Sequence, residues 1–242
     1  MSRVLRPLGT CVGLLALWWG LARFANIPAF LLPGPGAVAQ TLVAQWGFLA
    51  RNALVTLLEI ALGLGLGTLF GAGCALVMVA SRGVQRWLLP LLLLSQAVPV
   101  FALAPLLVLW LGFGLASKVL MAVLVIFFPV TAAFYDGLRR TEPGWLDLAR
   151  TMGASRLSIL WRVRLMAALP AFGAGLRIAA SVAPIGAIIG EWAGASEGLG
   201  YVMLNANARM QTNVMFAALM LLAGMTILLL SLIHISEPTR PY

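Results

Sequence analysis

Long runs of apolar residues, separated by short polar segments, make up most of the chain. The hydrocarbon core of a bilayer is about 30 Å thick, and a helix needs about 20 apolar residues to cross it. Runs of about this length predict six membrane-spanning helices, at residues 8–25, 53–79, 88–111, 117–135, 167–192 and 213–232. Because these runs are apolar on every side, the sequence predicts an all-α membrane protein with one transmembrane domain, residues 1–232.

Prolines and glycines predict local features inside these spans. Pro99 and Pro105 in the third span and Pro129 in the fourth are expected to kink or locally unwind their helices. The second span has a small residue at every fourth position, at Gly63, Gly67 and Gly71. This stripe favours the close approach of another helix, and we interpret it as ordinary helix packing.

The composition supports a membrane protein, and the placement of its charges predicts the orientation of the chain in the membrane. The chain is 62% hydrophobic and 10% charged, and its net charge is +9. If the N-terminus is cytoplasmic, the inner segments carry eleven arginines, whereas the outer segments carry three arginines and Lys118. This distribution follows the positive-inside rule, so the basic charge indicates topology and not a nucleic-acid partner. We therefore expect both termini in the cytoplasm.

The two ends of the chain carry separate predictions. Arg3 and Arg6 before an apolar run resemble a signal peptide, but no small-x-small cleavage site follows, so we expect a retained helix. Cys11 and Cys74 lie inside spans without a CxxC pattern, which favours apolar packing over metal or redox chemistry. Residues 233–242 resemble translated sequencing-adapter read-through; the alternative is a short solvated tail, and His234 carries no functional prediction.

Residues 136–166 hold nine of the 23 charged residues and form a longer connection than two helices require. The pattern predicts a helix capped by Thr141, a stop at Gly153 and a second helix capped by Ser155. An apolar face on the first helix consists of Leu148, Ala149 and Met152. Such an amphipathic hairpin either docks into a partner or lies on the bilayer, and the residues alone favour the bilayer.

The same stretch resembles the EAA loop in the membrane subunits of ATP-binding-cassette importers. That motif reads Glu-Ala-Ala, three residues, Gly, nine residues, then Ile-x-Leu-Pro. Here its positions are held by Asp147, Leu148, Ala149, Gly153, Val163, Leu165 and Met166. Leu148 replaces a small alanine and Met166 replaces the proline, which occurs instead at Pro170.

Other segments extend this resemblance from about Pro33 to Leu230. They are "LPGPGAV", "PVFALAPLLVLWLGFGLASK", "GLRIAASVAPIGAIIGEW" and "EGLGYVML". They resemble the importer branch that handles nitrate, sulfonates, taurine and thiamine-precursor pyrimidines. Within that branch, "GAIIGEWAGASEGLGYVMLNANARMQ" and "FFPVTAAFYDGLRRT" look closest to pyrimidine permeases, with sulfonate, taurine or nitrate uptake as the alternative.

The resemblance implies a type I importer transmembrane fold in a bacterial inner membrane. It also implies a homodimer that works with a dimer of cytoplasmic ATP-binding subunits and a soluble or lipid-anchored binding protein. The chain itself would be no enzyme and would hold no cofactor, since ATP binds the partner. Residues 136–166 would couple to the ATPase through Asp147, Leu148, Ala149, Met152, Gly153, Ala154, Val163 and Leu165.

Ionisable and polar residues inside spans are costly and often functional. Glu59, Gln96, Arg177 and Glu191 are the candidates for lining a translocation path. In the alternative, Arg177 snorkels to the interface and Glu191 simply lies near a helix end.

Two other classes of function, a hydrolase and a secondary transporter, are alternatives to an importer subunit. An intramembrane hydrolase is nearly excluded, because the one histidine, His234, lies in the doubtful tail and leaves neither a histidine-paired nucleophile nor a histidine metal site. A secondary transporter would work without an ATPase and would not need a docking hairpin.

Overall fold

The computed structural model describes residues 2–25 and 27–235, and these fold into helices joined by short connections. The predicted all-α class is therefore confirmed. The predictions for residues 236–242, and for the side chains of Cys11 and His234, lie outside the described part. The chain divides into two compact units, residues 1–55 with 196–224 and residues 56–195 with 225–242.

Unit 1 contains α1 (Ser2–Phe24), α2 (Pro35–Ala44), the first turns of α3 (Trp46–Ala80), α10 (Leu199–Ala208) and the first half of α11 (Thr212–Ile235). Trp18 on α1 stacks on Phe216 of α11, with ring centroids 5.8 Å apart. The start of α3 is tied to the segment before α10, because the side chain of Asn52 accepts a hydrogen bond from the Gly198 amide at 2.8 Å. Gly198 has a φ of 117°, a conformation that favours glycine.

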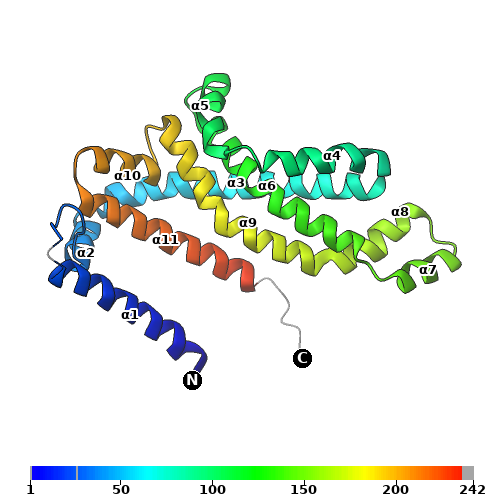
Figure 1. Ribbon diagram of the computed structural model, residues 1–242, viewed down its shortest axis with the longest axis horizontal. Helices are drawn as coiled ribbons and strands as arrows, with labels where there is room; N and C mark the ends of the chain where they lie inside the picture. The colour runs from blue at the N-terminus through cyan, green and yellow to red at the C-terminus, as the bar shows by residue number, and fades with distance from the viewer. Residues whose placement is uncertain (1, 26, 236–242) are drawn as a thin grey trace. The chain divides into compact units, whose positions relative to one another are not determined.

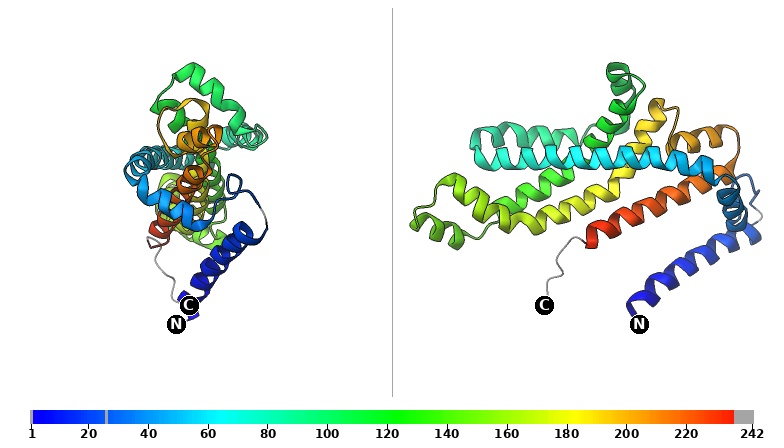
Figure 2. Two further views of the ribbon diagram at one scale, coloured as in Figure 1. Left: turned by 90° about the vertical axis from the view of Figure 1, so that its left-hand side faces the viewer. Right: turned by 180° about the vertical axis from the view of Figure 1, so that it is seen from behind.

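Unit 2 contains the rest of α3, then α4 (Arg82–Ser95), α5 (Val100–Leu111), α6 (Leu115–Arg139), α7 (Pro143–Thr151), α8 (Arg156–Ile159) and α9 (Leu165–Gly194). A π-helical segment, Leu160–Arg164, joins α8 to α9, so that one helix continues from Arg156 to Gly194. In Figure 1, α6 and α9 run side by side through this unit. Figure 2 shows the same arrangement from behind.

The core of unit 2 lies around α6, which packs between α3 and α9. Its buried members are Ile60, Ala122, Ile126, Val130, Ala179, Ala183 and Ala187. Glycines allow the close approach on both sides of α6. A Cβ on Gly63 would lie 2.4 Å from the Cβ of Ala122, and one on Gly186 would lie 2.8 Å from the Cα of Ala122. The glycine stripe of the second span thus packs helices within the chain, as interpreted from the sequence.

Four of the predicted spans are single helices long and apolar enough to cross a membrane. The third span is instead a broken pair, α4 and α5, bent by 101°. The first span corresponds to α1, whose described apolar part, Val12–Phe24, is shorter than a full crossing requires.

The prolines differ from one another in their effects. Pro99 lies directly before α5, so the predicted break is found there. Pro105 and Pro129 lie inside α5 and α6, which continue through them without local unwinding, so the kink that was the other expected effect stays a prediction. A proline removes a single backbone donor, which a helix packed on its neighbours tolerates.

Candidate functional site

The predicted coupling loop, residues 136–166, folds as a hairpin of α7 against the start of the long α8–α9 helix. α6 ends at Arg139, and Pro143 occupies the first turn of α7. The capping role predicted for Thr141 is wrong. Its hydroxyl donates to the Leu138 carbonyl at 3.2 Å and closes the end of α6, so Glu142 is the residue before α7.

The stop at Gly153 is confirmed by its backbone. Gly153 has a φ of 76°, and its amide donates to the Arg150 carbonyl at 2.9 Å while the Ala154 amide donates to Ala149 at 3.0 Å. This pair of bonds is a Schellman motif, which ends a helix at a residue in the left-handed region. Ser155 then caps α8 as predicted, since its hydroxyl accepts from the Ser158 amide at 3.2 Å.

The second arm of the hairpin differs from the prediction. It is continuous with the fifth span, so this helix begins at Arg156 and not at residue 167. Five residues of π-helix, Leu160–Arg164, lie at the junction. Leu160 is buried in the core beside Phe134, which anchors the base of the hairpin to unit 2.

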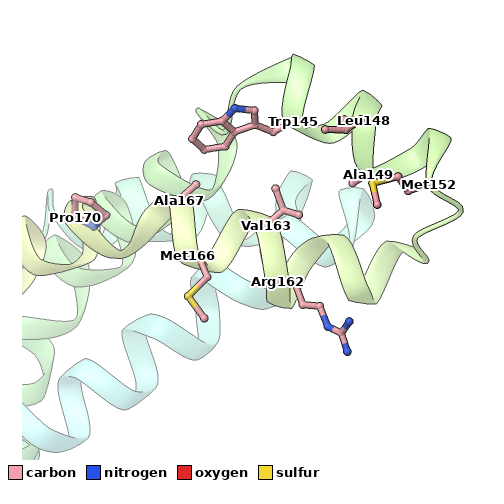
Figure 3. A pocket seen from close by; sticks show the side chains of 9 residues that line it. All are labelled: Trp145, Leu148, Ala149, Met152, Arg162, Val163, Met166, Ala167 and Pro170. Atoms are coloured by element: carbon pink, nitrogen blue, oxygen red, sulfur yellow. The ribbon is translucent and has the colours of Figure 1, made fainter.

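α7 presents an apolar surface that nothing in the described chain covers. Met152 is 78% exposed and Leu148 62% exposed, whereas Leu146 on the other side of the helix is buried. A groove of about 570 Å³ lies between α7 and the start of α9 (Figure 3). It is lined by Trp145, Leu148, Ala149, Met152, Arg162, Val163, Met166, Ala167 and Pro170. Exposed apolar surface of this kind marks an interaction site.

The groove gathers most of the residues that the motif singled out. Val163 points toward α7, whereas Arg162 points away from it. Leu165 does not line the groove and packs partly buried against the core of unit 2. Asp147 is exposed and pairs with Arg150 at 2.7 Å. Sequence reasoning missed Trp145, although an exposed tryptophan in a charged loop is itself a signal of a binding surface.

A second cluster joins three helices inside unit 2. The ammonium of Lys118 on α6 donates to Oε1 of Glu59 on α3 at 2.8 Å, and the Thr56 hydroxyl donates to Oε1 of Glu191 on α9 at 2.6 Å. Glu59 and Glu191 are 0% and 1% exposed. Glu191 lies three residues before the end of α9, and its carboxylate is held within the protein and not exposed at its surface. Glu191 is also close enough to Glu59 for the carboxylates to interact electrostatically.

A weak signal for this cluster is present in the sequence. Lys118 was assigned to an outer segment, but it lies in the first turn of α6 and is 9% exposed. It is the one lysine in the chain and directly precedes an apolar run, features that could have identified it as a partner for a buried acid.

The other two candidate path residues lie elsewhere in unit 2. Gln96 is exposed at the end of α4, in the break before α5, where its amide donates to Ser95 Oγ at 3.3 Å. Arg177 is half-buried on α9. It lies about 32 Å along the continuous helix from Arg156, at 1.5 Å per residue.

Comparisons with known proteins decide the family. Residues 63–239 match the family described as binding-protein-dependent transport system inner membrane component. The chain belongs to this family. It is 56% identical over 227 residues to a probable ABC transporter permease protein of Haemophilus influenzae, which covers 94% of this chain and 93% of the relative.

Other relatives and a solved structure agree with this assignment. The permease is 39% identical to the formylaminopyrimidine transport permease protein ThiX of Halalkalibacterium halodurans, over 89% of this chain and 86% of the relative. It is 33% identical to the taurine transport permease TauC of Escherichia coli, over 94% and 85%. An inward-facing MetNI methionine ABC transporter matches with a TM-score of 0.66 and 16% identity, covering 81% of this chain and 99% of that one, which shows a shared fold.

Family membership resolves the alternatives left by the sequence. The permease is a multi-pass membrane subunit of a binding-protein-dependent importer, so the secondary-transporter alternative is wrong. It is not an enzyme, because ATP hydrolysis in such importers occurs in a separate subunit. Its partners are an ATP-binding subunit and a substrate-binding protein.

Proposed function

We propose that the permease imports a pyrimidine precursor of thiamine, of the hydroxymethylpyrimidine or formylaminopyrimidine type. The observation that carries this proposal is the 39% identity to a formylaminopyrimidine permease, against 33% to a taurine permease. The second candidate is taurine or an aliphatic sulfonate, supported by relatives with these names at 33% and 30% identity.

Uptake in cells tests the substrate. Cells whose chromosomal permease gene is deleted are compared with the same cells carrying the permease on a plasmid. Both are given labelled formylaminopyrimidine, with unlabelled taurine or unlabelled formylaminopyrimidine as competitor. The proposal predicts uptake that depends on the permease and is blocked only by the pyrimidine. Uptake of labelled taurine under the same conditions would favour the second candidate, and no uptake of either would exclude both.

The candidate path residues have different roles in this proposal. Gln96 and Arg177 would contact the passing solute, since neither is fully buried within unit 2. Glu59 and Glu191 would shape the path by fixing α3 on α6 and α9 on α3, since both are buried and bonded within the chain. Arg177→Gln should then abolish uptake without lowering the amount of permease in the membrane, and unchanged uptake would remove Arg177 from the path.

The groove at α7 is proposed as the docking site for the ATP-binding subunit. The exposed side chains of Leu148 and Met152 would be buried in the partner, and the nearby arginines would meet its acidic rim. Movement of the docked hairpin would then pass to the spans, because α8 continues directly into α9.

Co-purification tests the docking site. Met152→Glu places a charge on a side chain that is 78% exposed, so the fold should be unaffected while the ATP-binding subunit is lost. Leu31→Glu, at a residue 58% exposed in the connection between α1 and α2, is the matched control and should retain it. Equal recovery of the ATP-binding subunit with both variants would contradict docking at α7.

Orientation and stoichiometry complete the proposal. We place both termini in the cytoplasm of a bacterial cell, because this puts the arginine-rich segments inside. Two copies of the permease would form the path together, with two ATP-binding subunits, since one chain supplies a single transmembrane domain. The mass of the intact complex in native mass spectrometry gives the subunit ratio directly.

A further inference from the structure

A second pocket, of about 360 Å³, lies in unit 2 between the end of α3, α4 and the second half of α6. Most of its lining is apolar, with Met78, Leu89, Leu92, Leu93 and Phe128. The pocket is separate from the groove at α7, with which it shares no lining residue. It also lies apart from the buried Glu59 cluster, so neither of the two candidate sites accounts for it.

One buried polar group in this pocket has its hydrogen bonding unsatisfied. Tyr135 is 4% exposed, and its hydroxyl oxygen is buried without a hydrogen-bond partner among the described residues. A buried tyrosine hydroxyl normally finds a partner, because an unpaired one has lost its bonds to water without compensation. The hydroxyl therefore points to a ligand with an acceptor at this depth in the pocket.

The charges of the pocket gather at one end. α4 and α6 run in opposite directions along it (Figure 1). Arg139 lines the end nearest the C-terminus of α6, with its guanidinium 5.5 Å from the Tyr135 ring centre. On α4, Arg86 lies three residues before Leu89 and so one turn beyond the pocket on the same face. Because the helices are antiparallel, Arg86 and Arg139 lie at the same end of the pocket.

The acidic residue of the lining does not cancel these cations. Asp136 lies at the same end of α6, but its carboxylate pairs with Arg140 at 3.2 Å. Arg86 and Arg139 make no ion pair with any described residue. The pocket thus has an apolar body, a hydrogen-bond donor in its middle and two cations at one end. A small polar solute would leave the apolar body unused, whereas an amphiphile with an anionic head would use all three parts.

We propose that this pocket binds an anionic phospholipid of the cytoplasmic leaflet. An acyl chain lies among the apolar side chains, an ester carbonyl accepts from the Tyr135 hydroxyl, and the phosphate lies at Arg86 and Arg139. Basic pockets between helices at the cytoplasmic face suit such lipids. The inference rests on the proposed orientation, which places the start of α4 and the end of α6 at that face, and does not depend on which solute is imported.

Native mass spectrometry of the purified permease, with the subunits that accompany it, tests the proposal. The delipidated protein is titrated with phosphatidylglycerol and, separately, with phosphatidylcholine. The wild type should bind one phosphatidylglycerol per chain ahead of phosphatidylcholine. Arg86→Gln and Arg139→Gln should each weaken phosphatidylglycerol about fivefold. Arg209→Gln, which removes an exposed arginine outside the pocket, is the charge control and should bind as the wild type does.

Tyr135→Phe distinguishes lipid bound in the pocket from lipid attracted to the protein surface by charge alone. It removes one oxygen and keeps the ring, and it should weaken both lipids by a similar factor, about two- to tenfold. A melting temperature equal to or above that of the wild type shows that the variant is folded. Equal binding of both lipids by every variant would overturn the proposal. Displacement of phosphatidylglycerol by the imported solute would also overturn it, because the pocket would then belong to the translocation path.

Discussion

At the scale of single residues, Lys118 decides whether two carboxylates can stay buried in unit 2. It is the described cation that contacts Glu59, and Glu191 lies in the same cluster. Removing one partner of a buried ion pair leaves an uncompensated charge, which is far more costly than losing the whole pair. The close packing of α3, α6 and α9 therefore depends on this cluster being intact.

Lys118→Met is expected to destabilise the permease by about 3–5 kcal/mol. The physical reason is that the Glu59 carboxyl group, at 0% exposure, loses the ammonium that contacts it and is left without that compensation in a buried site. The double variant Glu59→Gln/Lys118→Met should recover part of this loss, because it removes both charges. Thermal unfolding in detergent compares the three proteins, and equal melting temperatures for the single variant and the wild type would show that Lys118 is not needed.

Glycines on α3 give a prediction with an internal control. A Cβ on Gly71 would lie 2.7 Å from the Phe127 carbonyl oxygen, whereas one on Gly73 would meet nothing within 4 Å. Gly71→Ala should therefore push α3 away from α6 and cost about 1–3 kcal/mol. Gly73→Ala should be neutral or slightly stabilising. The yield and melting temperature of each variant measure the difference, and similar values for both would contradict close packing at Gly71.

At the scale of elements, the hairpin of α7 depends on the backbone of one residue. Gly153 has a φ of 76° and open space around it, so a side chain there is limited by conformation and not by contact. The left-handed region costs an ordinary residue about 1–2 kcal/mol, less for asparagine and more for a β-branched one. The direction of α7 relative to α8 thus follows from the Schellman turn.

Gly153→Val should turn α7 out of position and reduce transport-coupled ATP hydrolysis in the reconstituted importer. Gly153→Asn is the matched variant and should retain most of that hydrolysis, since asparagine tolerates the left-handed region. Substrate-stimulated ATPase rates in proteoliposomes give the comparison. If valine and asparagine behave alike, the backbone conformation at residue 153 does not control coupling.

At the scale of the whole molecule, the distribution of arginines predicts the orientation in the membrane. The prediction concerns Leu31 and Met152, both exposed and placed on opposite sides by the positive-inside rule. In a variant with Cys11→Ser and Cys74→Ala, a membrane-impermeant maleimide should label Leu31→Cys in intact spheroplasts. Met152→Cys should react only after the membrane is opened. The reverse pattern would invert the topology and with it the proposed lipid leaflet.

The sequence by itself determined the class of fold, most of the spans and the hairpin that is proposed for coupling. These depend on local signals, since apolar length sets a span and a glycine between two capped segments sets a helix stop. The residues proposed for coupling were found from a local signal too, because the motif positions Asp147, Ala149 and Gly153 are close together in the chain.

Only the tertiary structure decided how distant residues meet. The pairing of Lys118 with Glu59, the burial of Glu191 and the pocket at Tyr135 bring together residues from different helices. No local pattern encodes such contacts, because they depend on the rotation and register of packed helices. For the same reason the sequence left open whether Pro105 and Pro129 unwind their helices, because packing on neighbouring helices, and not proline alone, decides whether a span is interrupted.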